Sequence, residues 1–142
     1  MLEKILKGRV GVIDKVKDWE EAIKIASKPL IDDMSITSKY VDAMINNIKK
    51  YGTYIIVAPK VAMPHSRPED GVNKNALALL KINEGVIFDE EEEKINLIFI
   101  LGAVDNSSHI ETLTELMNIL DDEEKIEKLI KAKSINEIME LI

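Results

Sequence analysis

The segment that most constrains the fold is residues 95–104, INLIFILGAV, the most apolar run in the chain. An apolar run of this length without a charged side chain is typical of a strand that is covered on both faces. It therefore predicts the central strand of a sheet that lies between two layers of helices.

Shorter apolar runs predict the remaining strands, at residues 10–13, 54–58, 76–82 and 86–88. The run at 54–58 is expected to be a buried strand that delivers the segment after it to the edge of the sheet. The strands at 76–82, 86–88 and 95–104 follow one another too closely for parallel crossovers, which take about a dozen residues. Some of the pairing is therefore predicted to be antiparallel.

Amphipathic segments between and after these strands predict helices. Asp18 is the expected N-cap of one helix, which Pro29 should end or kink. A second helix should begin near residue 37 and stop at Gly52. Because helices and strands interleave, we predict one α/β domain over residues 1–142, with a mixed, partly antiparallel β-sheet sandwiched by helices on both faces.

A second stretch, APKVAMPHSRPEDGV at residues 58–72, carries the chemistry. It places His65 directly after Pro64 and shortly before Arg67 and Pro68. Each proline fixes its own φ and pushes the preceding residue out of the helical region, so this loop has few conformations. An imidazole held in this way at the end of a strand is a candidate nucleophile.

The other histidine, His109, follows Ser108 in the sequence SHIE, which has the S-x-x-E form of a capping box. Ser108 is the expected N-cap and His109 the first helical residue. Backbone N–H groups and the helix dipole favour an anion such as phosphate there, so both are candidate phosphate-binding residues. Each histidine is predicted near the C-terminal end of a strand, the edge at which open sheets bind ligands.

Composition excludes several classes of function. The 19 basic and 26 acidic side chains give a net charge of −7, which argues against binding to nucleic acid or anionic lipid. The chain has no cysteine, and therefore no disulfide, thiolate metal site or cysteine nucleophile. The start, MLEKILKGRV, is too charged for a signal peptide, and no run approaches the ~20 apolar residues of a membrane span. We expect a cytoplasmic protein without direct membrane insertion.

Three interpretations of the histidines stay open on the residues alone. They can be unrelated loop residues that bond locally, which is the commoner case. They can bind a metal together with Asp70 or Asp105, although no H-x-x-x-H or H-E-x-x-H spacing is present. One imidazole can also carry a phosphoryl group, with Arg67, His109 and a helix N-terminus as a charge clamp and without a metal or another cofactor. Ser66 would add a hydroxyl donor, although a serine in a turn more often bonds its own backbone.

The sequence TYIIVAPKVAMPHSRPEDGV resembles the active-site signature of the enzyme IIA domains of the bacterial sugar phosphotransferase system, in the fructose/mannitol superfamily. Its A-P-x-x-A-M-P-H-x-R-P-E run most closely resembles the ascorbate-type branch. The sequence DNSSHIETL at residues 105–113 is similar to the second histidine segment of the family. The resemblance spans nearly the whole chain and implies a mixed sheet with helices on both faces.

The resemblance implies that His65 is the phosphorylated residue and that His109 helps to hold the phosphoryl group. It implies the carrier protein HPr as donor and a cysteine of a IIB component as acceptor, which in turn serves a membrane IIC component. Mannitol-type members carry an arginine in the helix before the active strand, where this chain has Asn46 and Asn47. Arg67 is expected to supply the positive charge instead.

We therefore predict a phosphotransferase that takes a phosphoryl group from HPr on His65 and passes it to IIB for uptake of a sugar, with ascorbate suggested by the motif. The alternative is a regulatory IIA-like module that signals through its phosphorylation state without transport. The apolar residues 61–63 beside His65 are expected either to form part of the docking surface for these partners or to pack in the core.

Overall fold

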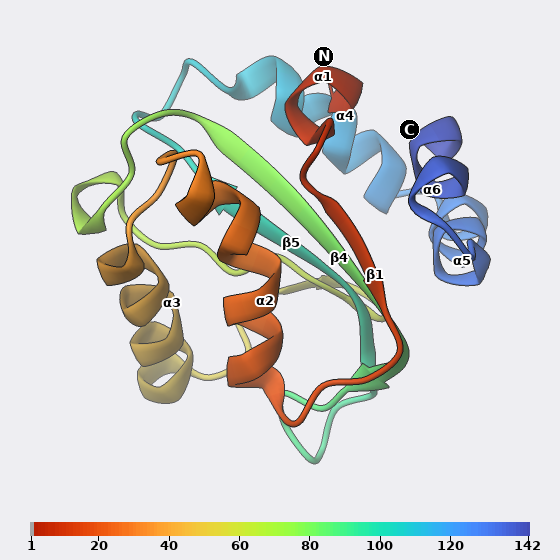
Figure 1. Ribbon diagram of the computed structural model, residues 1–142. Coiled ribbons are helices and arrows are strands. Elements are labelled where there is room, and N and C mark those ends of the chain that lie inside the picture. Colours follow the sequence, from red (N-terminus) through yellow and green to blue (C-terminus); the bar gives the residue numbers. More distant parts are fainter. Residues whose placement is uncertain (1) are drawn as a thin grey trace.

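The computed structural model describes residues 2–142, and in it a five-stranded sheet lies between two layers of helices (Figure 1). The order of the strands across the sheet is β1-β4-β5-β3-β2. In chain order the elements are α1 (Leu2–Leu6), β1 (Val10–Ile13), α2 (Trp19–Asp32), α3 (Ser38–Tyr51), β2 (Ile56–Ala58), β3 (Val61–Ala62), the 3₁₀ helix η1 (Pro68–Asp70), β4 (Ala76–Val86), β5 (Ile95–Gly102), α4 (Ile110–Leu120), α5 (Glu123–Lys131) and α6 (Ile135–Leu141).

The apolar strand β5 lies in the middle of the sheet, as its sequence predicts. It pairs antiparallel with β4 on one side and parallel with β3 on the other. At the two edges, β1 is parallel to β4 and β2 is antiparallel to β3. The sheet is therefore mixed, and the predicted fold class is confirmed.

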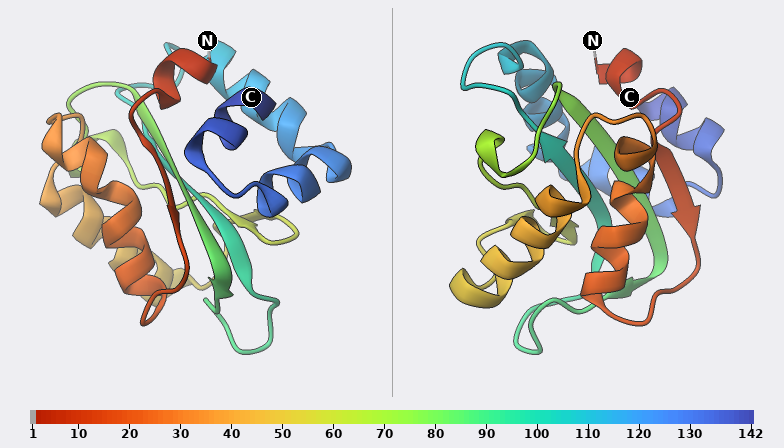
Figure 2. Two further views of the ribbon diagram at one scale, coloured as in Figure 1. Left: turned by 45° about the vertical axis from the view of Figure 1, so that its right-hand side comes forward. Right: turned by 60° about the vertical axis from the view of Figure 1, so that its left-hand side comes forward.

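The helices divide between the two faces of the sheet, with α2 and α3 on one face and α1, α4, α5 and α6 on the other (Figure 2). Consecutive residues of β5 point to opposite faces, so Ile98 joins the core under α2 and α3, whereas Phe99 joins the core under the other layer. Both side chains are buried. This double burial explains why the strand sequence is continuously apolar.

The helix ends mostly follow the sequence signals. The Asp18 side chain accepts a hydrogen bond from the backbone N of Glu21, and Gly52 ends α3 with a φ of 86°. The prediction that Pro29 ends α2 is wrong, because the helix continues to Asp32. Leu30, directly after the proline, is fully buried, so core packing holds the last turn although one helical hydrogen bond is missing.

The segment before His65 differs from the prediction. Strand β2 covers only Ile56–Ala58 and lies at the edge of the sheet, so the idea that a buried strand at 54–58 leads to His65 is wrong. Pro59 and Lys60, whose φ is 67°, turn the chain back into the short strand β3, which leads to His65. Residues 61–63 are buried, so they pack in the core and are not exposed for docking.

The predicted break between the strands at 76–82 and 86–88 is also wrong. Strand β4 runs without interruption from Ala76 to Val86, and an irregularity of its register with β5 falls between Lys81 and Val86. Gly85 lies within this irregular part with a φ of 74°. The glycine therefore permits an irregular continuation of the strand and does not end it.

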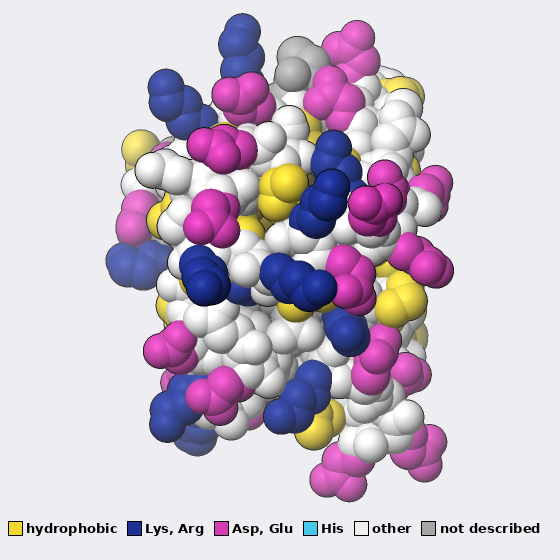
Figure 3. Space-filling view, turned by 90° about the vertical axis from the view of Figure 1, so that its right-hand side faces the viewer, with side chains coloured by type: hydrophobic (Ala, Val, Ile, Leu, Met, Phe, Trp, Pro, Cys, Tyr) yellow, Lys and Arg dark blue, Asp and Glu magenta, His cyan; other side chains and the backbone are white. Residues whose placement is uncertain are grey.

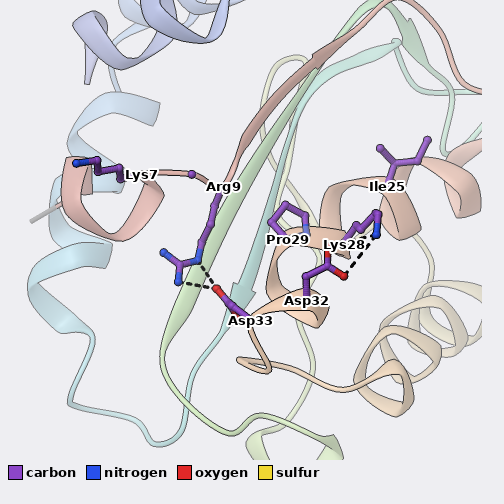
Figure 4. Close-up of a pocket in the computed structure, with 8 residues that line it drawn as sticks. Lys7, Arg9, Ile25, Lys28, Pro29, Asp32 and Asp33 are labelled. Atoms are coloured by element: carbon purple, nitrogen blue, oxygen red, sulfur yellow. Dashed lines mark hydrogen bonds and ion pairs between the residues drawn. The ribbon is translucent and has the colours of Figure 1, made fainter.

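A pocket of about 600 Å³ between the α1–β1 connection and α2 contains paired charges (Figure 4). Arg9 contacts Asp33 with Nε at 2.9 Å and Nη2 at 2.6 Å from Oδ2, and the Ser35 hydroxyl donates to Oδ1 at 2.5 Å. Burial raises the pKa of Asp33, but these hydrogen bonds outweigh burial and hold it below 3.8. The pair ties the chain after α1 to the end of α2 and involves neither histidine.

On the side of the molecule that carries α5 and α6, acidic and basic side chains are interspersed, with only scattered apolar ones between them (Figure 3). Within residues 2–142, no helix combines the length and the apolar character that crossing a membrane requires.

Candidate active site

The two histidines follow the carboxyl ends of adjacent parallel strands. His65 comes shortly after β3, and His109 comes after β5 at the start of α4. The pairing of these two strands continues past the end of β3, because the backbone N of Leu101 donates to the carbonyl of Pro64 at 3.3 Å. The sheet therefore brings both histidine segments to one edge, which is where open α/β sheets bind ligands.

The His65 ring is half-buried and held by its own backbone. Its Nδ1 lies 2.8 Å from the carbonyl oxygen of Met63. Because a carbonyl only accepts hydrogen bonds, Nδ1 carries the proton and the lone pair is on Nε2. The Tyr54 ring meets the imidazole edge-on, with 5.9 Å between ring centroids. The ring is thus oriented, with one nitrogen left as a nucleophile.

Tyr40 of α3 connects the histidine loop to the central strand. Its hydroxyl donates to the carbonyl of Leu101 at 2.7 Å and accepts from the backbone N of Ser66 at 2.9 Å. Burial raises the pKa of Tyr40 to about 12, so the hydroxyl stays protonated at neutral pH. From sequence alone, Tyr40 is only one member of the inward stripe of a helix. The available signal is that a buried tyrosine hydroxyl usually finds a hydrogen-bond partner.

The residues that follow His65 form a small network. The Ser66 hydroxyl donates to Oδ2 of Asp70 at 2.5 Å and accepts from Nδ2 of Asn47 at 3.0 Å. The backbone N of Arg67 also donates to Oδ2 of Asp70, at 3.3 Å. The Arg67 side chain is exposed, and its guanidinium makes no ion pair within the part of the chain that is described. Its charge is therefore available to an anionic ligand.

The second histidine segment differs from the prediction in one detail. His109 itself is the N-cap of α4, with φ −114° and ψ 12°, so Ser108 is not the N-cap. The reason is that Oδ1 of Asp105 accepts from the backbone N of Ser107 at 2.9 Å and of Ser108 at 2.7 Å, which forms a turn ahead of the helix. The Ser108 hydroxyl instead accepts from Nδ2 of Asn75 at 2.6 Å. The predicted position of His109 at a helix N-terminus is confirmed.

The Nδ1 atom of His109 is buried and has no hydrogen-bond partner among residues 2–142. A buried N–H without a partner is rarer in proteins than a buried acceptor without one. The neutral ring therefore favours the tautomer with its proton on Nε2, which makes Nε2 a hydrogen-bond donor.

Asp105 places a negative charge close to His109. Hydrogen bonds from the backbone of Ser108 and then of Ser107 lower the pKa of Asp105 below 3.8, and the hydroxyl of Ser108 and the charge of His109 contribute in the same direction.

As for a metal centre, residues 2–142 contain no group of three or more His, Cys, Asp or Glu side chains placed to hold an ion.

Fold and site together define a class of α/β proteins with a mixed sheet. One oriented histidine follows the carboxyl end of β3, and a second histidine lies in the connection from the neighbouring strand β5 to α4. The chain belongs to the family described as phosphoenolpyruvate-dependent sugar phosphotransferase system, EIIA 2, whose model matches residues 4–142.

Relatives and solved structures agree with this assignment. The chain is 38% identical over 133 residues to the mannitol-specific cryptic phosphotransferase enzyme IIA component of Escherichia coli K12, covering 94% of this chain and 90% of the relative. The solution structure of the mannitol-specific cryptic enzyme IIA from Escherichia coli matches with a TM-score of 0.92 at 35% identity, over 99% of this chain and 96% of that one.

Two further matches are an ascorbate-specific component and an enzyme IIA in complex with its IIB. The ascorbate-specific EIIA component of Escherichia coli K12 is 28% identical over 130 residues, 90% of this chain and 84% of the relative. A complex of enzyme IIAMTL and phosphorylated enzyme IIBMTL from Escherichia coli contains a chain with a TM-score of 0.78 and 32% identity, over 94% of this chain and 92% of that one. The chain is thus similar to both mannitol-type and ascorbate-type components.

Proposed function

We propose that this chain is a phosphoryl carrier of the sugar phosphotransferase system, which accepts a phosphoryl group on Nε2 of His65 from phosphorylated HPr and passes it to a cysteine of a IIB component in the cytoplasm. The observation that carries the proposal is the 2.8 Å hydrogen bond from Nδ1 to the Met63 carbonyl, which leaves the lone pair on Nε2. Membership of the family and the similarity to an enzyme IIA in complex with phosphorylated IIB support it.

The proposed transfer takes place in two steps and needs no cofactor, because each P–N or P–S bond forms as another bond to the same phosphorus breaks. In the first step the N–P bond of the donor phosphohistidine breaks while an N–P bond forms to Nε2 of His65. In the second step that bond breaks while an S–P bond forms to the thiolate of IIB. Phosphoryl transfer passes through a loose transition state, so the protein contributes chiefly by positioning and by charge.

Three groups near the sheet edge suit the negative charge of the phosphoryl group. Arg67 offers an exposed cation two residues after the nucleophile. His109 offers its Nε2 proton, and the start of α4 offers backbone N–H groups. We propose that these groups stabilise the phosphoryl group on His65. Ser66 and Ser108 flank the two histidines and are already hydrogen-bonded to neighbouring side chains.

The experiment that tests the proposal is phosphorylation by HPr and its phosphorylating enzyme with labelled phosphoenolpyruvate. The parent chain should take up label in an acid-labile form, and His65→Ala should take up none. His65→Ala labelled at the parental rate would contradict the proposal.

The second half of the proposal needs an acceptor. Because the relatives are mannitol-specific and ascorbate-specific components, the candidate acceptors are mannitol-type and ascorbate-type IIB components. Each acceptor is added separately to the labelled chain. Transfer of label to a IIB cysteine is expected for a transport component. A labelled chain that gives its phosphoryl group to neither class would favour the regulatory alternative.

A further inference from the structure

Each histidine stands next to a serine, and each of these serines is bound by an asparagine from a different element. Asn47 of α3 donates from Nδ2 to the hydroxyl of Ser66 at 3.0 Å. Asn75, directly before β4, donates from Nδ2 to the hydroxyl of Ser108 at 2.6 Å. The same pair of side chains therefore occurs twice, once beside His65 and once beside His109.

A carboxylate completes each pair. The Ser66 hydroxyl donates to Asp70 at 2.5 Å, and Asp105 accepts from the backbone N of Ser108 at 2.7 Å. The hydroxyl of Ser108 also contributes to lowering the pKa of Asp105. We call Asn47, Ser66 and Asp70 the first triad, and Asn75, Ser108 and Asp105 the second triad.

The first asparagine is also linked to the ring of its histidine. Burial raises the pKa of Tyr54 and Asn47 opposes this shift, while the Tyr54 ring meets the His65 ring edge-on. Asn47 thus contacts the histidine loop through Ser66, and its polar side chain also influences the tyrosine that packs against the ring.

The second asparagine spans the connection between β5 and α4. Its Oδ1 accepts from the backbone N of Val104 at 2.8 Å, while its Nδ2 binds Ser108. These two bonds fix both ends of the loop that carries Asp105 and leads to His109.

We propose that Asn47 and Asn75 are positioning residues, which set the orientation of the two histidine rings for phosphoryl transfer through the two triads. The inference rests on the proposed function. A displacement of reacting groups by about 1 Å can cost 100-fold in rate, so loops that carry such groups need fixed partners. Because the hydroxyl proton of Ser66 is directed at a carboxylate, Ser66 belongs to the positioning network and is not a donor to the phosphoryl group.

The two triads differ in exposure, which predicts unequal effects. Asn47, Ser66 and Asp70 are all partly buried, whereas Ser108 and Asp105 are exposed. Hydrogen bonds in contact with water are more easily replaced by water. Loss of Asn47 should therefore matter more than loss of Asn75.

The test compares Asn47→Ala and Asn75→Ala with two matched controls. Asn46→Ala changes the neighbouring, exposed asparagine of α3, and Asn118→Ala changes an exposed asparagine of α4. Rates of phosphoryl uptake are measured over a range of phosphorylated HPr concentrations. Asn47→Ala should lower kcat about tenfold or more, and Asn75→Ala less, with KM unchanged, because docking is unaffected. Triad variants that match the controls, or that raise KM alone, would overturn the proposal.

A second measurement does not depend on phosphoryl transfer. Nitrogen-15 NMR of the unphosphorylated chain should show the same ring-nitrogen signals of His65 in the parent and in Asn46→Ala, and shifted or broadened signals in Asn47→Ala, because the loop then holds the ring less firmly. An unchanged His65 spectrum in a folded Asn47→Ala chain would refute the positioning role. If the parent is never labelled, the proposed function fails, while this spectrum still decides the role of Asn47.

Should Asn47→Ala fail to fold, Ser66→Ala removes the same hydrogen bond from the other side, together with the bond to Asp70, and should lower kcat at least as much. Where both variants fold, their effects should add only in part in the double variant, because the two changes share the Asn47–Ser66 hydrogen bond. Full additivity would count against the first triad.

Discussion

The two histidine segments are built differently although they leave neighbouring strands at the same edge. The His65 segment lies between two prolines and is tied to the buried hydroxyl of Tyr40 and to the backbone of β5. The His109 segment is an exposed loop, held by the turn at Asp105 and by Asn75. A nucleophile that two partner proteins must reach in turn needs a fixed ring, whereas a group that only stabilises charge tolerates a looser support. The difference therefore agrees with unequal roles for the two rings.

Among variants that test this difference between the two segments, Tyr40→Phe is expected to have the largest effect, which is on stability. The change leaves the partly buried N–H of Ser66 and the carbonyl of Leu101 without their partner, and should lower the free energy of unfolding by about 1–3 kcal/mol. Urea denaturation measures it, and Tyr51→Phe is the control, because Tyr51 lies on the same helix with 65% of its surface exposed. Equal stability of the two variants would show that the hydroxyl of Tyr40 does not brace the loop.

The same tyrosine predicts an alkaline limit to stability. The folded state holds the pKa of Tyr40 at about 12, above its ordinary value of 10.0, so the folded chain keeps a proton that the unfolded chain loses. The difference in free energy of unfolding between the parent and Tyr40→Phe should therefore be full below pH 10.0 and should fall as the pH rises toward about 12.

The next largest effect is expected on the rate of phosphoryl uptake when the ring of His109 is removed. His109→Ala should slow phosphoryl uptake about tenfold or more, since a hydrogen bond to a charged group is worth about 1.5–3 kcal/mol, while uptake is not abolished as in His65→Ala. Single-turnover labelling measures the rate, and circular dichroism should show an unchanged fold. A parental rate would make His109 a structural residue and would end the functional contrast between the segments.

The smallest effect is expected for Asp105→Asn. The amide keeps an acceptor for the backbone of Ser107 and Ser108 but removes the charge beside His109, so uptake at neutral pH should change less than in His109→Ala. Because the pKa of Asp105 is lowered in the folded chain, its contribution to stability is full above pH 3.8 and is lost as the pH falls through the lower folded value. Thermal melts of the two chains should therefore converge in acid. A gap that widens in acid would contradict the assigned sign.

The sequence predicts the central strand and the ends of the helices well, because burial on both faces of a strand and helix caps leave direct signals. The run at 95–104 indicates the central strand, and Asp18 and Gly52 mark helix ends that the structure confirms. It fails for the strand before His65, where the turn at Pro59 and Lys60 splits one apparent strand into an edge hairpin. A turn that uses lysine at a positive φ has no sequence signature, since glycine or asparagine is the usual residue there.

The site is predictable only in part, for a related reason. His65 and His109 stand out as the two histidines of the chain, and prolines mark the loop around the first. Asn47, Asn75 and Tyr40 are inconspicuous in sequence, because their importance comes from partners that are distant along the chain. Hydrogen bonds of this kind depend on how the layers pack, and packing is not encoded in a local pattern.

The hydroxyl of Tyr40 meets both the loop after β3 and the strand β5, and this restricts how the chain length can vary between homologous proteins. A residue inserted between Met63 and Ser66 would move the N–H of Ser66 away from a tyrosine that is anchored in the core and cannot follow. The exposed connection between Phe88 and Lys94 has no such anchor in the core, so insertions and deletions should accumulate there and be absent from the histidine loop.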